Sequence, residues 1–117
     1  MGNVRELHTE AMALAQDAVA ARKKGDSIRA AQLAARALIP ERIAAEMLPN
    51  TPGSEPTRST LFLSAASLAV QAGDLDAALR LVEQGRAGSP SPSLIADFNH
   101  LVGLVTARRE ASPRARS

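Results

Sequence analysis

The dipeptide Gly-Asp occurs twice in this chain, at Gly25-Asp26 and at Gly73-Asp74, and alanine-rich segments of helical character flank both copies. Glycine tolerates the positive φ that a chain adopts just beyond a helix, and aspartate is a preferred N-cap of the helix that follows. We therefore expect each copy to join two antiparallel helices. The two Gly-Asp turns therefore predict a fold built from helical hairpins.

The helices of the first half follow from apolar residues that recur three and four positions apart. The first helix is expected from Val4 to Lys24, and the second begins after the first Gly-Asp pair. Pro40 leaves two interpretations open, because proline either kinks a helix or starts a new one. Glu41 to Leu48 is thus a kinked continuation or a short separate helix, with Ile43 and Met47 expected on its inner face.

The second half begins with a loop, since three prolines and a glycine lie between Pro49 and Pro56. The segment from Leu61 to Val70 is apolar around most of its circumference, which predicts a central helix covered on several sides. A further helix is expected from Leu75 to Gly85 or Gly88, and an amphipathic helix follows after Pro92. The expected fold class is all-α, with five to six helices.

Length and composition limit the classes of protein that fit. The chain has 117 residues, so we expect one helical domain over residues 1–109 and a flexible basic tail over residues 110–117. It has no cysteine, which excludes disulfides and zinc–thiolate sites, and its net charge is only +2. With no apolar leader and no run of membrane-spanning length, a cytoplasmic location is expected.

Placing the two Gly-Asp turns in register aligns small residues of the two halves. Ala18 aligns with Ala66, Ala30 aligns with Ala78, and Pro90 follows the last helix of the second unit. This pattern resembles the tetratricopeptide repeat, which has small residues where its two helices cross and a proline after the second helix. The resemblance implies a right-handed stack of antiparallel helical hairpins.

The chain departs from the repeat pattern in several places. The two turns are 48 residues apart, where the family spacing is about 34, and the inserted stretch Pro40–Glu55 accounts for the difference. Gly85 stands where the family has alanine. The block formed by residues 55–59 and 64–69 is also similar to a block in short bacterial proteins, and it implies no function. Two units are fewer than a stable solenoid needs, so the last helix or a partner is expected to cap the stack.

In proteins with this repeat, the first helix of each unit lines an inner groove. The groove implied by the resemblance is small and apolar here, which suits an inserted apolar helix from another protein or from a second copy of this chain. The alternative is that Glu41 to Leu48 or the last helix already fills it. The residues expected to line the groove are Ala15, Val19, Arg22, Thr60, Leu63, Ser67 and Val70.

Glu55 and Arg58 lie next to the start of the central helix and are a possible polar contact for a partner. A cation at this position opposes the helix dipole unless it has a partner. A surface Arg58 paired with a neighbouring carboxylate is therefore the alternative interpretation.

Catalytic and metal sites are not expected, and no cofactor or small-molecule substrate is implied. His8 and His100 are the only histidines, and they lie in the first and last expected helices. Asp97 and His100 can share a helix face, but a metal site needs three or four converging ligands. Ser64 and Ser67 have no adjacent base in the sequence and are expected to pack between helices.

The functional class expected from these patterns is a non-enzymatic adaptor or scaffold that binds another protein. The alternative is a regulatory nucleic-acid-binding protein that uses its basic ends. The chain has no Trp or Tyr on which single strands could stack, and the last helix lacks a basic face for a DNA groove. The basic residues available for that alternative are Arg22, Lys23, Lys24, Arg108, Arg109, Arg114 and Arg116.

Overall fold

The structure is a computed structural model, and it describes residues 2–111. Within this range the chain forms five α-helices and no strand, which confirms the expected all-α class. None of these helices combines the length and the hydropathy that crossing a membrane requires. The helices are α1 (Val4–Lys23), α2 (Ser27–Met47), α3 (Thr57–Ala72), α4 (Leu75–Arg86) and α5 (Pro92–Ala111), with a short 3₁₀ turn, η1 (Pro52–Ser54), in the main loop.

Both Gly-Asp pairs form the expected helix-to-helix turns. Gly25 and Gly73 have φ values of +81° and +83°, in the left-handed region that favours glycine. The carboxylates of Asp26 and Asp74 each accept the backbone N–H of the residue three positions ahead, at 3.0 and 3.1 Å. The same two aspartates donate their own N–H groups back to the preceding helix at 2.9 Å. Each pair thus satisfies backbone groups at the end of one helix and the start of the next.

Pro40 lies inside α2, so the segment after it continues the same helix and is not a separate one. The expectation that Ile43 and Met47 face inward is wrong, because both are exposed. The helix keeps its phase through Pro40, and at about 100° per residue its buried face then passes through Glu41, Ala44 and Ala45.

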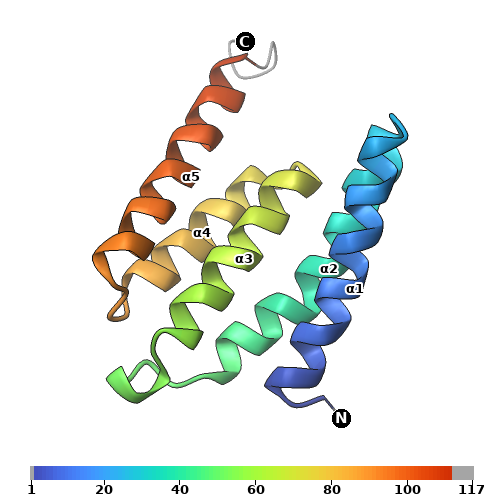
Figure 1. Cartoon of the computed structure of the whole chain (residues 1–117). Coiled ribbons are helices and arrows are strands. Elements are labelled where there is room, and N and C mark those ends of the chain that lie inside the picture. The colour runs from blue at the N-terminus through green and yellow to red at the C-terminus, as the bar shows by residue number, and fades with distance from the viewer. Residues whose placement is uncertain (1, 112–117) are drawn as a thin grey trace.

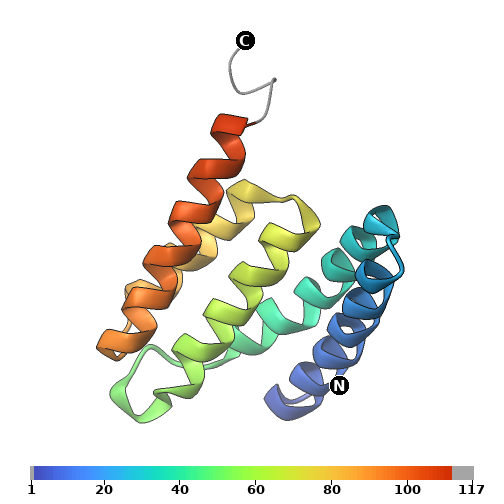
Figure 2. The ribbon, with the colours of Figure 1, turned by 45° about the horizontal axis from the view of Figure 1, so that its top comes forward.

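The helices are packed in chain order. Each helix packs on the next one along the chain, and α3 also packs on α5. Figures 1 and 2 show the α3–α4 hairpin between the α1–α2 pair and α5, with the first turn of α1 and the last turn of α5 at opposite ends of the molecule. Nine residues of α3 are buried, which confirms its central position. The helix α5 extends to Ala111, two residues beyond residue 109, where the helical domain was predicted to end, and residues 112–117 lie outside the described range.

The core is built mainly from alanine and leucine side chains, with two aromatic rings at its α5 end. Phe62 of α3 and Phe98 of α5 are the only aromatic residues of the chain, and both are buried. Both come close to Gly85 of α4, where a Cβ atom would lie 2.4 Å from the ring of Phe98 and 3.0 Å from Cβ of Phe62. The absence of a side chain at Gly85 therefore allows α3, α4 and α5 to meet.

Candidate partner-binding groove

The helices α1 and α3, expected to line the groove, both pack on α2. Ala15, Leu63 and Ser67 are half-buried, and Val19 and Thr60 are exposed. Arg22 is also exposed, and its Nη1 donates to the side-chain oxygen of Gln71 on α3 at 3.0 Å. Six of the seven predicted lining residues thus keep some accessible surface.

Val70 is the exception, because its side chain is buried and cannot line an open groove. Its backbone carbonyl accepts a hydrogen bond of 2.9 Å from Nη1 of Arg108 on α5. The last helix therefore reaches the Val70 end of α3. This contact agrees with the alternative that part of the groove is covered by the chain itself.

The open part of the groove lies at the opposite end, between the first turns of α1 and α3. It is a hollow of about 520 Å³ lined by Val4, Arg5, His8, Pro56, Thr57, Thr60 and Leu61. Among the predicted lining residues only Thr60 contributes to it. Val4, His8 and Thr57 were missed because the predicted stripe started one to three helical turns too late. His8 and Val4 lie seven and eleven positions before Ala15, and Thr57 lies three before Thr60.

His8 forms a hydrogen-bonded pair with Glu41 of α2 beside this hollow. Nδ1 of His8 lies 2.8 Å from Oε1 and 3.1 Å from Oε2 of Glu41, whose side chain is 0% exposed. A buried carboxylate needs a hydrogen-bond donor, and Nδ1 of His8 supplies one when it carries a proton. Nε2, on the other side of the ring, is then the atom that His8 offers to a partner. Local sequence patterns could not predict this pair, because its members are 33 positions apart.

Arg58 is not a surface residue, which corrects both interpretations made from the sequence. It is 8% exposed, and its guanidinium carbon lies 4.8 Å from the centre of the Phe62 ring. Nη2 donates to the backbone carbonyl of Gln84 at 3.2 Å, and Nε and Nη1 have no hydrogen-bond partner within residues 2–111. Arg58 is thus packed between α3 and the end of α4, where a partner cannot reach it.

Glu55 is also engaged inside the molecule, where it links two loops. Its carboxylate accepts hydrogen bonds from the N–H and Oγ of Ser59, at 3.0 and 2.8 Å, and from the N–H of Ser89 at 3.1 Å. Burial raises the pKa of Glu55, but these hydrogen bonds and the nearby Arg58 charge outweigh it and hold the pKa below its ordinary value. Glu55 and Arg58 therefore connect the main loop, α3 and the end of α4 to one another.

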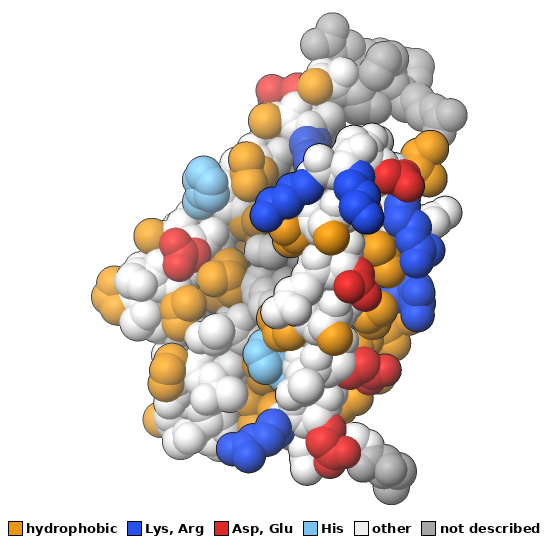
Figure 3. Space-filling view, turned by 45° about the vertical axis from the view of Figure 1, so that its right-hand side comes forward, with side chains coloured by type: hydrophobic (Ala, Val, Ile, Leu, Met, Phe, Trp, Pro, Cys, Tyr) orange, Lys and Arg blue, Asp and Glu red, His pale blue; other side chains and the backbone are white. Residues whose placement is uncertain are grey.

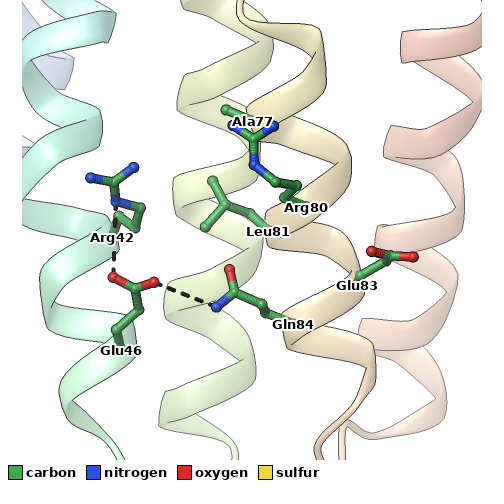
Figure 4. A pocket seen from close by; sticks show the side chains of 7 residues that line it. All are labelled: Arg42, Glu46, Ala77, Arg80, Leu81, Glu83 and Gln84. Atoms are coloured by element: carbon green, nitrogen blue, oxygen red, sulfur yellow. Dashed lines mark hydrogen bonds and ion pairs between the residues drawn. The ribbon is translucent and has the colours of Figure 1, made fainter.

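A second hollow, of about 430 Å³, lies between α2 and α4 and is shown in Figure 4. Its charged groups bind one another: Glu46 contacts Nε of Arg42 at 3.9 Å and accepts a hydrogen bond from Gln84 at 3.4 Å. In Figure 4 the side chain of Glu83 points away from these groups. The first contact lies within α2, and the second joins α2 to α4.

Two of the basic residues considered for nucleic acid also have partners at the end of α5. Arg108 donates to the backbone of α3, and Arg109 forms an ion pair with Asp76 at the start of α4. Arg114 and Arg116 lie outside the described residues. The ion pair of Arg109 offsets one of the positive charges that this end presents to a phosphate backbone, and the contact of Arg108 directs one of its donors into the protein.

The described residues contain no group of three or more His, Cys, Asp or Glu side chains that could hold a metal ion. His8 is on α1 and His100 on α5, and Figure 2 shows the α3–α4 hairpin between these helices. Asp97 and His100 are both exposed on α5.

A scan of protein-family models and searches of curated proteins and of solved structures found no match to this chain.

Proposed function

We propose that this chain is a non-enzymatic protein-interaction module of the tetratricopeptide-repeat type, a right-handed stack of hairpins that presents the groove between α1 and α3 to a helix of a partner protein. The observation that carries the proposal is the hollow of about 520 Å³ at the first turns of these two helices. Val4, Pro56 and Leu61 give it apolar walls. A groove between two helices suits an amphipathic helix that inserts apolar side chains one turn apart. A cytoplasmic location belongs to the same proposal.

The polar residues at the hollow define the partner further. Arg5 and His8 both contribute to its lining, and no acidic residue does. The buried carboxylate of Glu41 fixes the orientation of the His8 ring. A partner helix that combines apolar anchors with an acidic side chain would pair with the Arg5 guanidinium, because a charge-assisted hydrogen bond fixes the register of the bound helix.

A library of amphipathic helical peptides, selected for binding to the full chain, tests the proposal. Affinities of the selected peptides are measured by calorimetry for the wild type and for Thr60→Arg, which places a long charged side chain in the hollow. We expect Thr60→Arg to weaken binding at least about tenfold, because a buried unpaired charge is unfavourable. Thr106→Arg, at an exposed threonine of α5, is the matched control and should leave binding unchanged.

Two outcomes would contradict the proposal. Selected peptides that bind Thr60→Arg as tightly as the wild type would place the binding surface elsewhere. Failure to select any helix, together with binding of a duplex DNA probe that weakens steeply with salt, would favour the nucleic-acid alternative, since phosphate contacts release counterions and apolar contacts do not.

A further inference from the structure

The outer face of α2 carries an apolar strip that is separate from the groove. Ile28, Ile39, Ile43 and Met47 are 74%, 55%, 41% and 50% exposed, and together they make up four of the seven large exposed apolar residues of the described chain. At about 100° per residue these four lie within one side of the helix, opposite the buried residues Ala34, Glu41 and Ala45. Single exposed apolar side chains are ordinary, but Ile39, Ile43 and Met47 follow one another about one turn apart and form a patch. Ile28 lies on the same face, beyond the exposed Gln32 and Arg36.

The strip borders a hollow of its own on the same side of the molecule. Ile39, Pro40 and Ile43 of α2 line it together with Leu7 and Leu14 of α1, and its volume is about 270 Å³. Projecting isoleucines and an apolar recess therefore lie next to each other. A surface that contains both a projection and a recess can pack against a copy of itself.

The charges around the strip are of both signs. Glu10 and Arg36 line the same hollow, and within residues 2–111 neither forms an ion pair. Figure 3 shows acidic and basic side chains among apolar ones on the side of the molecule turned forward from the right of Figure 1. Such a surface complements a partner that carries the same mixture of charges. Glu10 would repel a strongly acidic partner, and Arg36 would repel a strongly basic one.

The position of Glu10 of α1 relative to the residues of α2 indicates how two copies would pack. α1 and α2 are antiparallel, and the contact between His8 and Glu41 places Glu10 beside Ile39. A two-fold axis that passes close to Ile39 then brings Ile39 of the two copies together. It also brings Arg36 of each copy to within three residues, about 4.5 Å along the helix, of the level of Glu10 in the other, so that their long side chains can form an ion pair that occurs twice.

We propose that the outer face of α2 is a homodimer interface, with two copies packed antiparallel about Ile39 and Ile43. A helix of 21 residues is about 31 Å long and about 10 Å wide, so the helix face supplies about 300 Å² per copy, to which the flanking edge of α1 adds. Stable interfaces bury about 800 Å² per partner, so we expect this smaller face to form a weak dimer whose population depends on protein concentration. The dimer leaves the α1–α3 groove free.

Sedimentation equilibrium of the full chain, from about 1 to about 200 μM, tests the dimer because association depends on concentration. The wild type should change from monomer to dimer within this range. Ile43→Glu should raise the dissociation constant at least about tenfold, since it adds a charge to the apolar contact in both copies. Ile95→Glu is the matched control, because Ile95 of α5 is 40% exposed and Ile43 is 41% exposed.

A charge exchange tests the geometry. Arg36→Glu alone should weaken the dimer, and Glu10→Arg added to it should restore the wild-type dissociation constant. A monomeric wild type at every concentration overturns the proposal, as does a dimer that is insensitive to Ile43→Glu. A dimer disrupted by Thr60→Arg instead would place self-association in the groove, which also overturns it.

Discussion

Gly85 is the position at which the packing of the last helix can be tested most sharply. In Gly85→Ala the new Cβ would lie 2.4 Å from Cζ and 2.8 Å from Cε1 of Phe98, and 3.0 Å from Cβ of Phe62. Ordinary carbon contacts are about 3.5–4.0 Å long, so the Phe98 ring has to retreat by about 1 Å. The ring is completely buried, and it can retreat only if α5 moves away from α3 and α4.

Two effects of Gly85→Ala oppose each other. Alanine in place of glycine stabilises a helix interior by about 1 kcal/mol. Overpacking of a closed core destabilises by about 1–3 kcal/mol, and the contact of 2.4 Å places this substitution near the upper limit. We therefore expect a net loss of about 2 kcal/mol in the free energy of unfolding, or about 8 °C in Tm for a domain of this size.

Urea unfolding followed by circular dichroism measures this loss, since the chain has no Trp or Tyr for fluorescence. Gly103→Ala is the matched control, because Gly103 is also inside a helix but has no atom within 4 Å of the new Cβ. It should be stabilised by up to about 1 kcal/mol. Phe98→Leu should couple with Gly85→Ala, so that the double variant loses less than the sum of the two single losses. Gly85→Ala as stable as Gly103→Ala would refute the packing described for α5.

Three further predictions concern the turns and the buried polar groups. Gly73→Ala should lower the free energy of unfolding by about 1 kcal/mol, because alanine is unfavourable at φ +83°; Gly53→Ala, without a positive φ, should show no such loss in the same urea experiment. His8→Ala should cost about 1–3 kcal/mol by leaving the Glu41 carboxylate buried without a donor, and adding Glu41→Leu should recover most of the loss in Tm. The fold lowers the pKa of Glu55, so its carboxylate stabilises the protein at pH values above its ordinary pKa of about 4.3, and this contribution is lost as the pH falls through the lowered pKa. The urea midpoint of Glu55→Gln should therefore fall less steeply than that of the wild type between about pH 5 and about pH 3. An equally steep fall would contradict this.

The features that could be predicted from the sequence are those set by local rules. The Gly-Asp turns, the main loop and the central helix follow from backbone preferences and apolar spacing within one or two helical turns. The burial of Arg58 could not be predicted in this way. A cation at the start of a helix is usually solvated, and only the packing of Phe62 and of the end of α4 around it removes it from water.

The same reason explains the other differences. The pairing of His8 with Glu41 depends on how α1 crosses α2, which apolar periodicity does not specify. The exposure of Ile43 follows from a helix that continues in phase through Pro40, where the sequence left a break equally open. Gly85 departs from the repeat pattern because α5 places Phe98 against it. Each of these depends on contacts between residues that are distant in the chain.

Amide chemical shifts of the ¹⁵N-labelled full chain, recorded during titration with a selected amphipathic peptide, test the central proposal most directly. A helix bound between α1 and α3 should shift the amides around Val4, His8, Thr57 and Leu61, and it should leave those of the outer face of α2 unchanged. Shifts confined to α5 or to the outer face of α2 would contradict the assignment of the groove as the partner-binding surface.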